Sequence, residues 1–331
     1  MTDFAELSAR VRAAGLLDRR PVYYAVRLTL VALMVIGGWV AFALVGDSWW
    51  ALLVAVLMGV TFAQLALVAH DLAHRQVFRT ATASGRAGLI AGNLGIGMSY
   101  GYWMNKHTRH HANPNHDDLD PDVGPGALVW NAEEAAKRRG FSAWAARNQH
   151  YLFFPLLTLL GLSLRKDSIA TLPSLPRRES VFLGLHFAGY LGALLLVLSP
   201  GKALAFFVVH QALFGVYLGM TFAPNHKGMP HPTGDEDFLR KQVLTSRNVR
   251  GGWGVTVALG GLNYQIEHHL FPAMPTPNLR RAQPIVREYC REAGVDYEET
   301  GLIESYAIAL RHLRDIGRHA GSVPASGGVA V

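Results

Sequence analysis

Four stretches of the chain are almost free of charged residues and are long enough to cross a lipid bilayer. They cover residues 28–46, 49–69, 181–198 and 203–223, and their only ionisable side chains are His186 and His210. A crossing helix needs about 20 mostly apolar residues, so each stretch predicts a transmembrane helix. Two residues separate the first pair of spans and four separate the second pair, so the spans form two helical hairpins.

Three further apolar stretches fit a crossing less well. Residues 151–164 and 252–264 are short for a span, and residues 87–103 are rich in glycine. We expect all three to lie in the membrane interface or to dip into it. Residues 276–319 mix charged and apolar positions at helical spacing and predict cytosolic helix, and the last dozen residues predict a disordered tail.

The composition supports a membrane protein. Hydrophobic residues make up 50% of the 331 positions and charged residues only 17%, whereas soluble domains usually carry about 25% charged residues. The single cysteine, Cys290, excludes an intrachain disulfide, a cysteine-based zinc site and a resident iron–sulfur cluster. The net charge of +7 is compatible with nucleic acid, but the apolar stretches favour an anionic membrane surface as the partner, so no nucleic-acid partner is predicted.

The basic residues predict how the chain is oriented. Five lysines and arginines precede residue 28, 13 lie between residues 70 and 180, and 12 follow residue 223, whereas the two short turns contain none and one. Because cytoplasmic segments are enriched in lysine and arginine, both termini and the long middle segment are expected in the cytosol. The 27 residues before the first span show no signal-peptide pattern.

Histidines gather at the predicted cytosolic ends of the spans. His70 and His74 follow the second span, and a single histidine, His226, follows the fourth. Two further clusters lie in the other cytosolic segments, at residues 107–111 and 265–269. Within each cluster the spacing of three or four residues places the rings on one helical face. The clustered histidines are His70, His74, His107, His110, His111, His226, His268 and His269.

Eight clustered imidazoles indicate a metal centre. Imidazole suits zinc, copper, iron or nickel, and eight rings exceed the four ligands of a zinc site, so two ions sharing them is the economical interpretation. If residues 87–103 crossed the membrane, the first two clusters would lie roughly 30 Å apart, on opposite faces. A shared centre therefore predicts that neither residues 87–103 nor residues 252–264 cross.

The remaining histidines are expected to have structural roles. His210 lies 16 residues before His226, about 24 Å away along a helix, so it and His186 are expected to form interhelical hydrogen bonds. His231 lies close to a clustered histidine in sequence, and its role stays open. The other four are expected to be solvated or hydrogen-bonded: His116, His150, His312 and His319.

Three motifs carry a family resemblance. They are HDLAH at residues 70–74, HTRHH at residues 107–111 and QIEHH at residues 265–269, and we call them the histidine boxes. With these boxes in this order beside two helical hairpins, residues 25–290 resemble the membrane fatty acid desaturases, within the wider group of integral membrane di-iron desaturases and hydroxylases. The resemblance implies an all-α integral membrane fold with four transmembrane helices in two hairpins and a cytosolic helical cap that holds a di-iron site.

The resemblance also implies domains and ligands. It divides the chain into a cytosolic leader at residues 1–27, a membrane desaturase domain at residues 28–290, and a cytosolic helix with a disordered tail at residues 291–331. It makes the eight clustered histidines the iron ligands. Gln265 stands where many members have a histidine. This glutamine form of the third box is similar to the one in front-end desaturases and in some bacterial acyl desaturases. Gln265, Asn225 or a water molecule is therefore expected to complete the second iron's shell.

Acidic residues in and near the boxes are candidates to orient the ligands, because ligating histidines normally donate their second N–H group to a carboxylate or carbonyl. Asp71 and Glu267 lie inside boxes. Asp117, Asp118 and Asp120 follow the second box. The alternative is a solvated acidic turn, which we favour for residues 120–122.

The function that the resemblance implies is O2-dependent desaturation of a long fatty acyl chain. Oxidising an unactivated methylene needs an iron oxidant derived from O2. The electrons must come from a separate protein of the ferredoxin, rubredoxin or cytochrome type, because the chain has neither a haem motif nor cluster cysteines. A hydroxylase of the same group is the nearest alternative, and a divalent-metal transporter is a remote one because the histidines lie at span ends rather than mid-membrane.

The substrate is expected in a tunnel between the helices and the cap. Four aromatic residues are candidates to line it or to form an interfacial belt: Tyr100, Tyr102, Trp103 and Trp253. Seven basic residues are candidates to meet a CoA or phospholipid phosphate or an acidic electron donor: Lys106, Arg109, Lys227, Arg240, Lys241, Arg247 and Arg250. The acyl carrier and the bond oxidised stay open. A multi-pass protein of the cell membrane, if bacterial, is expected.

Overall fold

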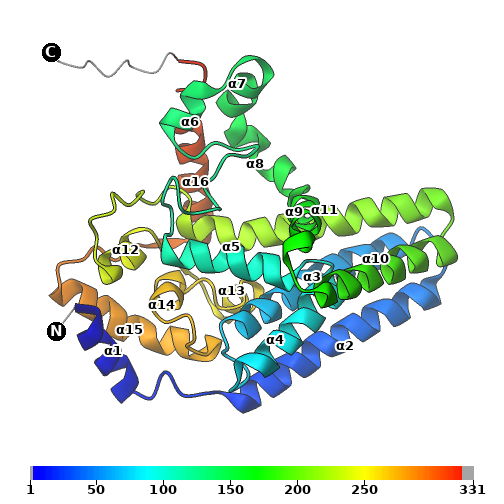
Figure 1. Cartoon of the computed structure of the whole chain (residues 1–331), viewed down its shortest axis with the longest axis horizontal. Coiled ribbons are helices and arrows are strands. Elements are labelled where there is room, and N and C mark those ends of the chain that lie inside the picture. The colour runs from blue at the N-terminus through cyan, green and yellow to red at the C-terminus, as the bar shows by residue number, and fades with distance from the viewer. Residues whose placement is uncertain (1–2, 323–331) are drawn as a thin grey trace.

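The computed structural model describes residues 3–322, and its longest helices form a membrane-type bundle. These are α2 (Pro21–Val45), α3 (Ala51–Ala73), α10 (Arg177–Val197) and α11 (Pro200–His226). Each is long and apolar enough to cross a membrane, and the four run alongside one another (Figure 1). The predicted spans and both hairpins are therefore confirmed, although three of the helices begin three to seven residues earlier than predicted and two end three or four residues later.

Two of these helices form the centre of the bundle. In the apolar windows of α3 and α11, 56% and 44% of the residues are buried, against 17% in α2 and 22% in α10. Gly59 allows α3 to approach α11 closely, because a Cβ atom there would lie 2.9 Å from the Cβ atom of Leu213. On α2, large apolar side chains such as Leu33 and Ile36 are exposed, as expected for a surface that faces lipid.

The turn between α2 and α3 contacts the turn between α10 and α11, at the end of the bundle opposite to His226. Asp47, in the first turn, accepts hydrogen bonds from the backbone N–H group of Ser199 at 2.9 Å and from its hydroxyl at 3.0 Å. Lys202 lies 3.2 Å from the same carboxylate. These contacts hold the two hairpins in register.

Residues 87–103 turn back instead of crossing as one helix. They belong to α4 (Ala81–Leu89), the π-helix η1 (Ile90–Ile96) and α5 (Tyr100–Ala112). Gly97 ends η1 with a φ of +69°, a conformation that favours glycine. Ser99 then caps α5 by accepting a hydrogen bond from the N–H group of Tyr102 at 3.1 Å.

A buried polar network holds the start of α5. The carboxylate of Glu179, on α10, accepts hydrogen bonds from the Asn93 amide and, at 3.1 Å, from the Ser99 hydroxyl. The Asn93 carbonyl oxygen accepts from the N–H group of Tyr100 at 2.9 Å. Ser168 accepts from the N–H group of Ser99 at 3.1 Å. The helix that carries the second histidine box is thereby fixed to α10 and its neighbours.

The middle segment continues through short helices, of which α8 and α9 pack along α11. They are α6 (Ala132–Lys137), α7 (Gly140–Arg147), α8 (Gln149–Leu157), α9 (Leu160–Thr171) and the 3-10 helix η2 (Leu172–Ser174). The buried Arg165 of α9 donates to the Gln211 side chain on α11 and, at 2.7 Å, to the carbonyl of Ile96. The apolar stretch at residues 151–164 is therefore broken into two helices that pack beside α11, and neither is long enough to cross.

Most of the remaining elements form a cap over one end of the bundle (Figure 1). They are α1 (Asp3–Ala13), α12 (Phe238–Leu244), β1 (Asn248–Arg250), α13 (Trp253–Ala258), α14 (Gln265–Leu270), α15 (Thr276–Glu292) and β2 (Glu299–Gly301). The last helix, α16 (Leu302–Gly317), instead packs beside α6, α7, α8 and α11. Leu7, Leu239, Ile266 and Val286 lie in one buried cluster that joins α1, α12, α14 and α15. Residues 252–264 contain only the short α13, so this stretch forms no crossing helix.

The C-terminal region is helical as predicted, but a short strand interrupts it. Strand β2 pairs in parallel with β1, with Asn248 opposite Glu299 and Arg250 opposite Gly301. The sequence pattern did not predict this pair. Most of the predicted tail, residues 323–331, lies outside the described residues, and the division of the chain at residues 27 and 290 stays a prediction.

Candidate metal centre

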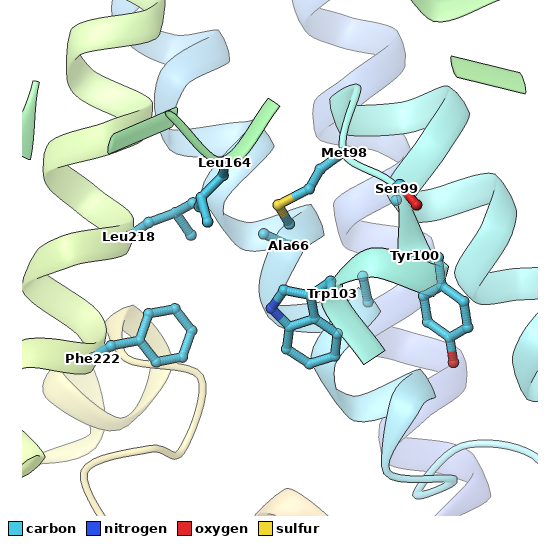
Figure 2. Close-up of a pocket in the computed structure, with 10 residues that line it drawn as sticks. Ala66, Met98, Ser99, Tyr100, Trp103, Leu164, Leu218 and Phe222 are labelled. Carbon is cyan, nitrogen blue, oxygen red and sulfur yellow. The ribbon is translucent and has the colours of Figure 1, made fainter. Parts of the chain in front are cut away.

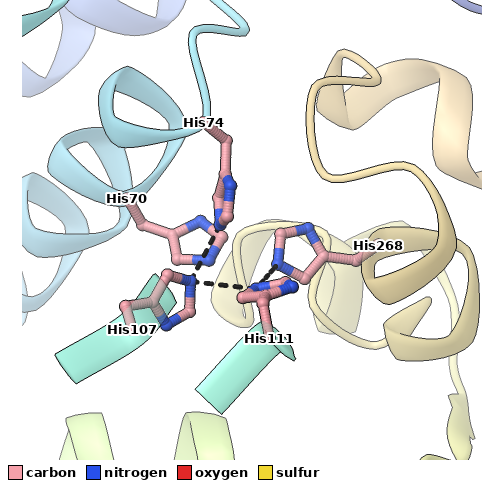
Figure 3. A group of neighbouring side chains, drawn as sticks. All are labelled: His70, His74, His107, His111 and His268. Carbon is pink, nitrogen blue, oxygen red and sulfur yellow. Dashed lines mark hydrogen bonds between the residues drawn. The ribbon is translucent and has the colours of Figure 1, made fainter. Parts of the chain in front are cut away.

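Five histidines from three separate parts of the chain meet where the cap covers the bundle. His70 and His74 come from the end of α3, His107 and His111 from α5, and His268 from α14 (Figure 3). We call them the five-histidine group; one ring nitrogen of each lies within 4.8 Å of the others. The Glu179 network holds the start of α5, and the rings of His107 and His111 on this helix face the end of α3.

The spacing of these rings fits a shared metal ion. The Nε2 atom of His107 lies 2.8 Å from that of His74 and 3.1 Å from that of His111, which in turn lies 3.2 Å from the Nε2 atom of His268. Nitrogen ligands at about 2.1 Å from a metal and at right angles to each other lie about 3 Å apart. The Nε2 atom of His70 is buried without a hydrogen-bond partner among the described residues, as expected for a ligand atom.

A second group contains His110, His226 and His269, and we call it the three-histidine group. One nitrogen of each ring lies within 4.8 Å of the others, and all three side chains are buried. The groups adjoin, because the rings of His111 and His269 stack with centroids 4.2 Å apart. The Nε2 atom of His269 also has no hydrogen-bond partner within residues 3–322.

Each ring of the three-histidine group is oriented by an acceptor at its other nitrogen. The Nδ1 atom of His110 donates to Asp120 at 2.9 Å, that of His226 to the carbonyl of Thr245 at 3.0 Å, and that of His269 to the Gln242 side chain at 2.9 Å. The Nε2 atom of each ring is therefore the nitrogen that would face a metal, and that of His226 lies 2.9 Å from the side-chain nitrogen of Gln265. This arrangement matches the hydrogen bonding that usually fixes histidine ligands.

The expectation for Asp120 was wrong. Its side chain is only 2% exposed and does not form a solvated turn. Besides His110, it accepts hydrogen bonds from the backbone N–H groups of Asn115 at 2.8 Å and Asp122 at 2.9 Å. Although burial acts to raise it, these hydrogen bonds and His110 keep the pKa of Asp120 below its ordinary value, so the group is a carboxylate. The exposed Asp117 instead faces His231, at 2.8 Å.

The two acidic residues inside the boxes have other partners. Asp71 forms a salt bridge of 2.8 Å with Arg27, and the hydroxyl of Thr276 donates to it at 3.3 Å. Asp71 lies 3.6 Å from the Nδ1 atom of His70, beyond hydrogen-bond distance. Glu267 accepts from Asn248 and from the hydroxyl of Tyr297, both at 2.7 Å. Neither side chain accepts a hydrogen bond from a clustered histidine. Asp71 instead links α3 to Arg27 on α2 and to Thr276 of the cap, and Glu267 links parts of the cap to one another.

Gln265 lies at the three-histidine group. Its Nε2 atom is 2.9 Å from the Nε2 atom of His226, and its oxygen accepts from the Asn225 amide at 3.2 Å. The amide oxygen of Asn225 is buried without a partner among the described residues. Both amides therefore lie where the two residues could complete a metal shell that has only three imidazoles.

Burial keeps five of the clustered rings neutral. Desolvation, reinforced by neighbouring histidines, lowers the pKa well below 6.5 for His74, His107, His111, His268 and His269. Neutral imidazole is the form that binds metal, so these five rings need no deprotonation at neutral pH.

The other histidines lie outside both groups. His210 bonds to the hydroxyl of Tyr190 on α10 at 2.6 Å, and His186 donates to the carbonyl of Leu94 at 2.8 Å, so both form the expected contacts between elements. His231 faces Asp117 and is not part of either group. His312 lies 3.1 Å from the carbonyl of Trp130.

A mostly apolar pocket lies among the helices that carry the histidines, and Figure 2 shows the side chains that line it. Ala66, Trp103 and Phe222 line it, each four residues before a clustered histidine on α3, α5 and α11 respectively. Four residues are about one helical turn, or 5.4 Å, so the pocket begins one turn from the rings. Trp103 stacks on His107 with centroids 4.3 Å apart. The rest of the lining comprises Ala69, Gly92, Met98, Ser99, Tyr100, Leu164 and Leu218.

Some predicted lining and binding residues lie elsewhere. Tyr100 and Trp103 line the pocket, but the hydroxyl of Tyr102 faces Asp167 at 3.5 Å and Trp253 is 78% exposed. Arg247 is fully buried, donating to backbone carbonyls that include that of Pro224 at 2.6 Å. Because its guanidinium is occupied, Arg247 cannot meet a phosphate or a partner protein.

Several supporting residues were not found from the sequence. Gln242 bridges the two groups, because its side chain accepts from His269 and donates to the carbonyl of His111 at 3.0 Å. Asn115 donates to the carbonyls of His226 at 3.1 Å and Thr245 at 3.3 Å. No local motif marks these residues, since their partners lie far away in the sequence.

Comparisons with known proteins support the family resemblance of the histidine boxes. A family model described as fatty acid desaturase matches residues 47–301. A Delta(5) fatty acid desaturase of Caenorhabditis elegans is 31% identical over 95% of this chain and 73% of its own length. An acyl-lipid 8-desaturase of Rebecca salina is 32% identical over 94% of this chain and 75% of its own length. An acyl-lipid (9-3)-desaturase of Physcomitrium patens is 29% identical over 97% of this chain, which spans 63% of that protein's length.

Proposed function

Because the chain belongs to the fatty acid desaturase family, whose members are oxidoreductases acting on acyl chains, we propose that it is an O2-dependent fatty acyl desaturase with a di-iron centre. The observation that carries this proposal is the convergence of eight histidines, distant in sequence, into two adjoining groups at one end of a membrane bundle. The names of the relatives favour desaturation over the hydroxylase alternative. A transporter is disfavoured because the rings lie at helix ends.

The two histidine groups are the proposed iron sites. The five-histidine group would hold one iron, and the three-histidine group would hold the other with Gln265 or Asn225 completing its shell. When bound, the iron pair supplies the O2-dependent oxidation of an unactivated methylene, which side chains alone cannot perform. Asp120, Thr245 and Gln242 orient the second set of rings and fix which nitrogen each presents.

The pocket is the proposed site of the reacting segment of the acyl chain, since its cavity of about 30 Å³ is too small for the whole chain. Its walls are mostly apolar, and they come from the same helices that carry the histidines, one turn away. A chain lying in it would bring one methylene up to the rings while Trp103 and Phe222 keep water from the reacting carbon. The relatives carry names for different bond positions, and two are named acyl-lipid desaturases, so acyl-lipid and acyl-CoA are both substrates to test.

The proposal also includes an electron-donor protein and an orientation of the chain in the membrane. A separate ferredoxin, rubredoxin or cytochrome would supply the electrons, since the sequence has one cysteine and that residue is buried. Both termini and the histidine groups would face the cytosol, because the turns at the opposite end of the bundle carry a single basic residue. In a bacterium the host membrane would be the cell membrane.

Expression in a desaturase-deficient host tests the proposal. Acyl chains are profiled by mass spectrometry with localisation of double bonds, comparing the wild type with His110→Ala and His231→Ala. We expect new unsaturated chains with the wild type and His231→Ala, and none with His110→Ala, since only His110 belongs to a histidine group. Hydroxylated products alone, or full activity in His110→Ala at equal membrane abundance, would overturn the proposal.

A further inference from the structure

One helix outside the bundle has an exposed aromatic face. On α7, Phe141 is 80% and Trp144 49% exposed, and their rings stack with centroids 5.3 Å apart. On the opposite side Ala143 and Ala146 are buried in a cluster with Ala320. The helix is thus amphipathic, and within residues 3–322 its aromatic side, which we call the α7 face, is not covered.

The contacts of α8 and α9 show at which level of the bundle this face lies. Phe153 packs with Ala223, near the end of α11 that carries His226. Eight residues later, a Cβ atom at Gly161 would touch the ring of Phe214. The chain therefore descends along α11, away from the histidine groups, as it passes from α8 to α9. Helix α7 immediately precedes α8, so it lies at the histidine end of the bundle.

Exposed apolar side chains also lie on the two helices that follow α7 along the chain. Along α8 and α9, Tyr151 is 73%, Leu159 54% and Ile169 50% exposed, beside a helix long enough to cross the bilayer. Helices α6 and α7 project sideways from the bundle, transverse to the four long helices (Figure 1). A projection transverse to crossing helices extends along the membrane surface rather than away from it.

Basic residues flank the aromatic pair. Arg138, Arg139 and Arg147 lie at the two ends of α7. Each donates from one guanidinium nitrogen to backbone carbonyl oxygen, and within residues 3–322 none of them forms an ion pair. Unlike the buried Arg247, Arg139 and Arg147 are exposed, so their other N–H groups can reach phosphate. Tryptophan and arginine are the side chains that suit the membrane interface, where the ring enters the apolar boundary and the guanidinium reaches phosphate. The exposed face therefore has both the apolar centre and the positive rim that an anionic lipid surface requires.

We propose that the α7 face lies in the headgroup region of the leaflet next to the histidine groups, with Phe141 and Trp144 at the acyl boundary and the arginines at lipid phosphates. This contact would fix the lobe formed by α6, α7 and α16 against the membrane. The inference rests on the crossing by the four long helices and does not depend on the proposed reaction.

A single fluorescent label tests this placement in the full chain. The native Cys290 is fully buried, and burial raises the pKa of its thiol to about 12, so it should not react with a maleimide. Phe141→Cys is labelled with a maleimide fluorophore and reconstituted in nanodiscs containing phosphatidylcholine and phosphatidylglycerol. Glu133→Cys, on α6 of the same lobe and with its carboxylate side chain 78% exposed, is the matched control.

The label at residue 141 should lose its fluorescence to a lipid that carries a quencher near its headgroup and should resist aqueous iodide. The label at residue 133 should show the opposite pattern. Quenching of the 141 label by iodide as strong as that of the control would overturn the inference, and so would resistance to both quenchers, which would mean that protein covers the face. Acyl-product formation by both variants is measured alongside, so a failure of the proposed reaction is recognised separately.

Discussion

Replacing Asp120 by asparagine should weaken iron binding without disturbing the fold elsewhere. The carboxylate accepts three hydrogen bonds, from the Nδ1 atom of His110 at 2.9 Å and from the N–H groups of Asn115 at 2.8 Å and Asp122 at 2.9 Å. Asparagine offers only one acceptor oxygen, so its amide N–H₂ group must face at least one of these donors. The ring of His110 loses the negative charge of Asp120 in either case, and it also loses its acceptor when the amide N–H₂ group faces it.

The expected size of the effect follows from these contacts. Loss of a hydrogen bond that orients a metal ligand typically costs about 10- to 100-fold in metal affinity or activity. Since a tenfold change corresponds to about 1.4 kcal/mol, the loss is about 1.4 to 2.8 kcal/mol. That range agrees with the cost of about 1 to 3 kcal/mol for leaving a buried donor without an acceptor.

Competition with a chelator measures the effect in purified protein. Iron retained per chain is followed against chelator concentration for the wild type, Asp120→Asn and Asp117→Asn. Asp117 lies in the same acidic turn but contacts His231 and Asn131, neither of which is in a histidine group, so its variant should match the wild type. The reasoning fails if Asp120→Asn holds iron as tightly as Asp117→Asn.

Three further substitutions test the supporting structure. Glu179→Ala leaves the Ser99 hydroxyl without its buried acceptor and leaves the Asn93 amide only the backbone carbonyl of residue 179. It should lower stability by about 1 to 3 kcal/mol, measured as a lower unfolding midpoint in detergent, with a smaller loss for Glu179→Gln. Ala66→Phe fills the apolar pocket and should lower acyl-product formation while iron content, measured by elemental analysis, stays at the wild-type level. Gly97→Ala places a Cβ atom 2.3 Å from the ring of His186, in a residue whose φ of +69° already disfavours a side chain, so it should lower the thermal midpoint of unfolding. An unchanged midpoint would contradict the tight packing between Gly97 and His186.

The crossing helices and the histidine groups were predictable because each leaves a local pattern in the sequence, and because the histidines must reach one common centre. A run of apolar residues has few alternatives to a membrane helix, and histidines three or four residues apart must share a helical face. The requirement that His70 and His107 reach one centre then excluded a crossing by residues 87–103. The structure agrees, with the turn at Gly97 separating η1 from α5.

The residues that orient the rings were not predictable, because their partners are set by tertiary packing. The composition of the acidic turn after the second box predicts a solvated turn, and no local pattern indicates that Asp120 is buried beside His110. Gln242 lies 27 residues before His269, on a helix without any motif. The parallel pairing of β1 with β2 likewise joins residues 51 positions apart, and three-residue strands leave no periodic pattern.

Metal analysis of the purified protein tests the central claim most directly. We propose that two adjoining groups of imidazoles bind two irons, and that the three-histidine group forms the second site. We expect two tightly held irons per chain in the wild type and one in His226→Ala, with membrane abundance unchanged. A wild-type protein that holds exchangeable zinc or a single iron, or a His226→Ala variant that retains both irons, would contradict it.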